Sequence, residues 1–133
     1  MTLVLSTPAN PGTAAWTDAS TLPGTRLPLN IVPLIGVGYL IPDGDDAVYL
    51  FETTTVDSVT LPPVANNVGR TLIVTCSGSN FINFNTSGSD GIAPYFNPVL
   101  IDPTASPRCV TFVAIEAASS LYGVDCWLIT SQF

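Results

Sequence analysis

No histidine and no lysine occur in this chain of 133 residues. Without histidine, neither a Ser-His-Asp arrangement nor a histidine-bearing zinc site can be built. Without lysine, a Schiff-base nucleophile and a phosphate-binding P-loop are excluded as well. Cys76, Cys109 and Cys126 are too far apart in the sequence for a CxxC pair. These absences predict a chain that is not an enzyme and has no catalytic, cofactor-binding or metal-binding residues.

Charge is scarce and mostly negative. Charged residues make up 10% of the chain and the formal net charge is -7, whereas an average soluble domain has roughly 25% charged residues. Nucleic acids and anionic membranes both require clustered cations, and the only cationic residues are Arg26, Arg70 and Arg108. We therefore expect neither as a partner. Repeated contacts with other protein subunits would account for so uncharged a surface, although an uncharged monomeric β-sandwich also fits.

Carboxylates and thiols are the remaining reactive groups. Asp43, Asp45 and Asp46 crowd one turn and offer oxygen ligands to Ca²⁺, but no glutamate closes a calcium loop, which favours a hairpin turn with solvated aspartates. Met1–Pro8 lacks the basic region of a signal peptide, so we expect a cytosolic, reducing environment. That environment predicts three small buried hydrophobic cysteines. A Cys109–Cys126 bridge is the alternative.

Residues 1–36 combine regularly spaced prolines with apolar side chains and almost no charge. Prolines exclude both a long helix and a central strand. We therefore expect an extended N-terminal arm that reaches onto a neighbouring subunit, the alternative being an arm folded back on its own domain. Trp16 is the first candidate for an anchor in a partner's pocket, because tryptophan is enriched at binding hot spots. The expected partner-binding residues are Leu3, Val4, Leu5, Pro8, Pro11, Trp16 and Leu22.

Residues 37–133 read as short strands separated by turns. Branched and aromatic residues fill runs bounded by Gly, Pro, Asn and Ser, and no helical periodicity persists. These features predict an all-β unit, an antiparallel β-sandwich or barrel-like domain, with a hairpin at Pro42–Asp45 and Trp127 in the core. The expected strands are Val37–Ile41, Ala47–Phe51, Val56–Leu61, Arg70–Cys76, Asn80–Asn85, Ile92–Phe96, Val99–Ile101, Cys109–Ile115 and Val124–Ile129.

Several short motifs occur in a fixed order within this unit. They are Val59–Pro62 (VTLP), Ala65–Val74 (ANNVGRTLIV), Ser77–Asn80 followed by Ile82, and Val124–Ile129 with its tryptophan. Together they resemble a repeat of bacteriophage tail-fibre, head-fibre and decoration proteins, over roughly residues 47–130. Prolines end a strand at Pro62, and Gly69 permits a positive φ. Arg70 has three possible partners, which are a backbone carbonyl, a carboxylate or solvent.

The resemblance implies a β-module of a virus particle, often trimeric. The shortness of the chain favours a capsid decoration (cement) protein, made in the host cytoplasm, that stabilises the outer capsid surface. Its expected partners are the major capsid protein and copies of itself in a homotrimer, without a cofactor. One alternative is a receptor- or glycan-binding module of a tail or head fibre. A tail-tube or connector component is the third.

Overall fold

The computed structural model describes residues 3–6, 15–18, 27–36, 38–94, 99–102, 104 and 108–133, with the backbone alone at 3–6, 15–18, 99 and 100. Within these ranges the chain forms β-strands and two short 3₁₀ helices, η2 (Val64–Asn66) and η3 (Ala117–Ser119). The predicted all-β class is therefore confirmed. Over the same ranges, no helix is long and apolar enough to cross a lipid bilayer.

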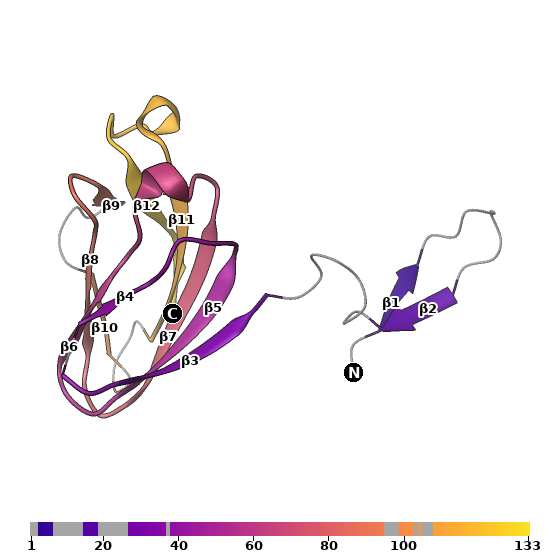
Figure 1. Cartoon of the computed structure of the whole chain (residues 1–133), viewed down its shortest axis with the longest axis horizontal. Helices are drawn as coiled ribbons and strands as arrows, with labels where there is room; N and C mark the ends of the chain where they lie inside the picture. Colours follow the sequence, from indigo (N-terminus) through magenta and orange to yellow (C-terminus); the bar gives the residue numbers. More distant parts are fainter. Residues whose placement is uncertain are drawn as a thin grey trace.

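Two larger sheets face each other in Figure 1, with strand orders β3-β5-β7-β11-β12-β9 and β10-β8-β6-β4. The six-stranded sheet contains β3 (Leu29–Leu34), β5 (Ala47–Thr53), β7 (Thr71–Gly78), β9 (Gly91–Ala93), β11 (Cys109–Ile115) and β12 (Cys126–Gln132). The four-stranded sheet contains β4 (Tyr39–Leu40), β6 (Asp57–Thr60), β8 (Ile82–Asn85) and β10 (Val99–Ile101). A separate antiparallel sheet pairs β1 (Leu3–Ser6) with β2 (Ala15–Asp18).

From β3 to β8 the chain coils, entering the two larger sheets alternately. In each sheet, a strand pairs in parallel with the strand two positions further along the chain. The prediction of antiparallel sheets is wrong for these pairs and for β9–β12, but the pairs formed by β11 and the β8–β10 pair are antiparallel. A parallel pair needs a long crossover, which here is a strand of the opposite sheet. Pro42–Asp45 is accordingly no hairpin, because it joins β4 to β5 in the other sheet.

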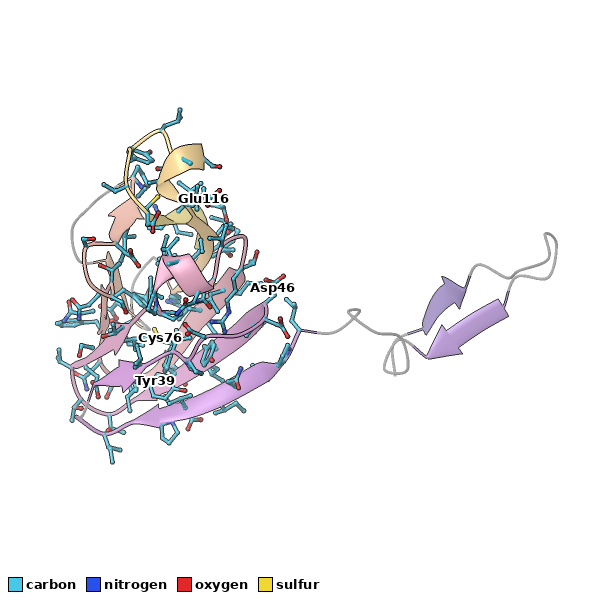
Figure 2. All side chains as sticks on the ribbon, turned by 45° about the horizontal axis from the view of Figure 1, so that its top comes forward. Tyr39, Asp46, Cys76 and Glu116 are labelled. Atoms are coloured by element: carbon cyan, nitrogen blue, oxygen red, sulfur yellow. The ribbon has the colours of Figure 1, made fainter. Side chains whose placement is uncertain are left out.

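The core lies between the two sheets. Alternation on β8 turns Ile82 and Phe84 inward, and the same holds for alternate residues of β7. The rings of Phe84 and Phe112 are 5.3 Å apart, and those of Tyr39 and Phe51 are 5.5 Å apart, so both pairs join one sheet to the other. Tyr39 is labelled in Figure 2, among the side chains between the sheets.

The arm expected over residues 1–36 differs from the structure at its end, because β3 is the edge strand of the six-stranded sheet. The Val48 amide donates to the Pro28 carbonyl at 2.9 Å. In a parallel pair this places the next donors toward β5 on Asn30, and then at every second residue. Pro33, which has no amide hydrogen, therefore faces the open edge, where a strand tolerates proline.

Gly78 forms the corner where β7 leaves its sheet for β8. Its φ is 105°, and a Cβ atom there would lie 2.1 Å from the Thr53 carbonyl oxygen. The following amide, that of Ser79, donates to this oxygen at 3.1 Å. Only glycine allows so close an approach of two backbones. The turn predicted at Ser77–Ser79 is thus a passage between sheets.

Candidate functional site

The expected partner-binding residues fall into two groups. Leu3, Val4 and Leu5 lie in β1 and Trp16 lies in β2, with Leu5 opposite Trp16 in the register. Pro8, Pro11 and Leu22 lie outside the described residues. The structure therefore brings four of the seven positions into one small sheet, and their role in binding a partner stays a prediction.

Arg70 is buried at the corner between β4 and β5. Its Nε donates to the Asp45 carbonyl at 2.6 Å, and Nη1 donates to the Pro42 carbonyl at 2.6 Å. Nη1 also donates to Oδ1 of Asn67 at 2.9 Å. Of the three partners left open by the sequence, the backbone carbonyl is the observed one. The guanidinium therefore holds the acidic turn in place from inside.

The three clustered aspartates take separate positions around that corner. Asp43 accepts from the Nδ2 atoms of Asn66 and Asn67, at 3.1 and 2.7 Å. Asp46, which Figure 2 labels, accepts from the Thr71 amide at 2.8 Å. Among the described residues, no group of three or more Cys, Asp or Glu side chains is arranged to hold a metal ion.

Other carboxylates also bind backbone amides at the ends of strands. Asp57 accepts from the Gly36 amide at 2.9 Å, and Asp90 accepts from the Val64 amide at 2.8 Å. Asp125 accepts from the Ala117 amide at 2.7 Å. A carboxylate that accepts from a backbone amide makes a charge-assisted bond that stabilises the turn. In these positions the acidic side chains fix the path of the chain.

An open depression of about 550 Å³ lies beside the Arg70 corner. Its lining includes Leu27, Pro28, Asp45, Asp46, Asn66 and Val68. Carboxylate and amide groups at its wall are able to accept and donate hydrogen bonds to a polar ligand.

Residues that carry the sequence resemblance bind other strands of the fold, and in one case another of the motifs. Trp127 is fully buried, as predicted, and its Nε1 donates to the Pro62 carbonyl at 2.9 Å. Gly69 has a φ of 81°, as its predicted role requires, and its amide donates to the Ala114 carbonyl at 2.9 Å. The motif thus builds the fold, and its tryptophan belongs to the core.

All three cysteines carry free thiols, so the alternative Cys109–Cys126 bridge is wrong. The predicted burial is confirmed for Cys76 and Cys126, but it is wrong for Cys109, which is half-buried. Burial raises the pKa of Cys76 from 9.0 to about 11, and burial also raises the pKa of Cys109. A thiol with a raised pKa stays protonated at neutral pH and is a poor nucleophile.

The outward side of the six-stranded sheet is mostly apolar on β3 and β5, whereas β7 and β11 mix apolar residues with threonine there. Neighbouring strands align Leu29 with Val48 and Ile73, and Ile31 with Leu50. Leu29 and Ile31 have 61% and 56% of their surface exposed. We call the following set the apolar face: Leu29, Ile31, Val48, Leu50, Ile73 and Val113.

The outward side of the four-stranded sheet is mainly polar on β6 and β8. Ser58 and Thr60 alternate with buried residues of β6, and Asn83 and Asn85 do so on β8. We call these four residues the polar face. Leu40, on the short strand β4, is the apolar residue next to it in the register and is 59% exposed.

The apolar face was missed at the level of sequence, although a signal for it exists. The run Ala47–Phe51 is apolar at every position, and such a run is typical of a strand covered on both sides in a parallel sheet. Because Leu29 and Ile31 were assigned to the arm, their alignment with this run was not foreseen. The parallel register brings them together.

Comparison with known proteins adds no relative. No protein-family model, curated protein sequence or solved structure matches the chain.

Proposed function

We propose that the protein is a structural component of a bacteriophage particle, and specifically a capsid decoration protein. In this role it binds the outer capsid surface and reinforces the joints between major capsid subunits, without catalysis. The likeness of residues 47–130 to phage fibre and decoration proteins is the reason for proposing a place in a phage particle. The observation that carries an assembly role is the apolar face, on a chain with so little charge elsewhere.

The proposal includes a more specific fold, which is a β-sandwich with an attached N-terminal arm. Buried aromatic residues from both sheets contact one another, and arginine and aspartate side chains fix the corners. Such a body is a rigid platform from which the residues before Leu27 can reach a neighbour. Added backbone hydrogen bonds at a neighbour's sheet edge would then supply affinity.

A glycan-binding module is the second candidate, and the depression beside Arg70 favours it. Asp45, Asp46 and Asn66 at its wall are residue types that hydrogen-bond sugar hydroxyls. This candidate predicts that the isolated protein binds host cells or purified surface glycan, and that Asp46→Asn with Asn66→Ala abolishes binding. Capsid decoration predicts no such binding.

The decisive measurement is the number of copies in each particle, together with binding to stripped capsids. Decoration predicts hundreds of copies, determined by quantitative mass spectrometry, whereas fibre or tail components occur in a few to tens.

Removing residues 2–20, or Trp16→Ala alone, should abolish capsid binding while the body stays folded. Leu121→Ala is the matched control, because Leu121 is fully exposed on the body. Full occupancy by the truncated chain would refute the role of the arm.

A further inference from the structure

The outer sides of the two larger sheets differ in chemistry. On the four-stranded sheet, β6 and β8 alternate buried residues with Ser, Thr and Asn, the pattern of a sheet that faces water on one side. On the six-stranded sheet, β3 and β5 place leucine, isoleucine and valine at the equivalent outward positions. An apolar sheet side of this kind marks an interaction site in a soluble protein.

The charges around the apolar face lie at its margins. The outward positions of β5 are Val48, Leu50 and Glu52, and Asp46 directly precedes the strand, so that one carboxylate stands at each end of an apolar pair. An apolar centre with a polar rim is the usual composition of a protein–protein interface. Nucleic acid and anionic lipid do not fit an uncharged centre bounded by carboxylates.

Because the chain is acidic, a second copy can be bound here only through a surface that carries no charge. Two copies with a formal charge of -7 each repel one another. The outward residues of the apolar face carry no charge, so contact there brings apolar groups together with the fewest carboxylates between them. The face is also self-complementary, because an apolar sheet side packs on an identical one at about 10 Å.

The area for such a contact comes from the whole outward side of the sheet, which places Thr71, Thr75 and Thr111 beside the apolar face. Five of its strands, β3, β5, β7, β11 and β12, lie side by side and have six to eight residues each. At ~4.8 Å between strands and ~3.3 Å per residue, they cover on the order of 500 Å² in plan. The accessible area of a corrugated face is larger than its plan, and a specific interface buries roughly 800 Å² on each partner.

The open edge of β3 is a less suitable contact than the face. Pro33 stands at that edge without an amide hydrogen, and proline at an edge hinders pairing with a further strand.

We infer that the apolar face packs against the apolar face of a second copy of this chain. This inference deepens the proposed function, because it names the surface through which copies meet in the particle.

The test uses the full chain and two leucines of almost equal exposure. Leu29→Glu places a charge within the apolar face, on the edge strand β3, whereas Leu40→Glu places it on the other sheet, where Leu40 is 59% exposed against 61% for Leu29. Sedimentation equilibrium over a concentration series gives the association constant of each variant. An unpaired charge at this edge of the contact is desolvated only in part and should weaken self-association on the order of 10-fold in Leu29→Glu. Leu40→Glu should associate as the unchanged chain does.

Two further readouts keep the result independent of folding defects. Ile31→Glu, a second exposed position, should act as Leu29→Glu does, and far-ultraviolet circular dichroism should show the same spectrum for all variants.

Because the contact is apolar between acidic chains, added salt should strengthen association by screening repulsion. Cys109 aligns with Thr75 and hence with Leu50, so its alkylation should be slow in the assembled chain and faster on dilution.

The outcomes separate cleanly. Dissociation by Leu29→Glu and Ile31→Glu but not by Leu40→Glu supports the contact. A chain that is monomeric at all concentrations, or one that Leu40→Glu disperses instead, overturns it. Capsid binding, measured separately with the same variants, reports on the proposed function, so that a monomer that still decorates capsids refutes this contact alone.

Discussion

The two larger sheets share one interior but treat their outward sides differently. The inward residues of both are apolar and contact across the core, as Phe84 and Phe112 do. Outward, β8 presents Asn83 and Asn85 while β5 presents Val48 and Leu50. The core requires apolar residues on the inward side of both sheets, but it does not determine which residues occupy their outward sides. The inward sides that the sheets share form the core, and the outward sides that distinguish them are where the proposed contact lies.

The largest loss of stability should follow from breaking a corner that the two sheets share. Arg70→Met removes three hydrogen bonds of a buried guanidinium and leaves the Pro42 and Asp45 carbonyls without their donor. We expect about 4 kcal/mol of destabilisation in urea-induced unfolding. Arg108→Met, at an exposed arginine, is the control and should cost less than about 0.5 kcal/mol. Equal stabilities of the two variants would contradict the role of this corner.

The second corner offers a matched pair of glycines. Gly78→Ala forces a Cβ against the Thr53 carbonyl at a positive φ, whereas Gly69→Ala has the positive φ without a close neighbour. We expect about 3 kcal/mol for Gly78→Ala and about 1 kcal/mol for Gly69→Ala, from the same unfolding measurement. If Gly69→Ala were the more damaging change, the close approach at Gly78 would not be the cause.

The inward side of the six-stranded sheet can be tested through the pH dependence of stability. Cys76 faces the core in Figure 2, and its pKa is raised to about 11 in the folded chain from 9.0. Its contribution to stability is complete below pH 9 and is lost as the pH rises to about 11, because only the unfolded thiol ionises in that interval. Relative to Cys76→Ala, we expect the unchanged chain to lose about 2 kcal/mol between these two pH values. Parallel pH profiles would contradict this prediction.

The smallest effect on stability is expected on the outward sides themselves. Asn83→Val with Asn85→Val gives the polar face the chemistry of the apolar face, and should change the free energy of unfolding by less than about 0.5 kcal/mol. The same variant should gain self-association, measured by light scattering at increasing concentration. Asn83→Thr with Asn85→Thr is the control. A variant that stays as dispersed as this control would show that an apolar sheet side alone does not drive association.

Much of the strand content could be predicted from the sequence, because alternation and turn residues are local signals. Cys109–Ile115 and Val99–Ile101 are strands with the predicted bounds, and β7 and β8 alternate between the core and the outward side. Strand direction could not be predicted. A turn such as Pro42–Asp45 has the same composition in a hairpin and in a passage between sheets, and the choice depends on Arg70 from 25 residues further along the chain.

The candidate site was predictable only in part. The core role of Trp127 and the positive φ of Gly69 follow from alternation and from the motif. The apolar face depends on the parallel register between β3, β5 and β7, which no local signal specifies. Of the arm residues, Leu5 and Trp16 meet in a register that the prolines around them did not indicate.

The place of β12 has a consequence for synthesis on the ribosome. This strand lies between β11 and β9, and its Trp127 side chain donates to the carbonyl of Pro62, 65 residues earlier. A nascent chain that still lacks residues 126–132 therefore has no partner to place beside β9 and no donor for that carbonyl. Residues 126–132 complete the body, so its folding is expected to finish only after these residues have left the exit tunnel.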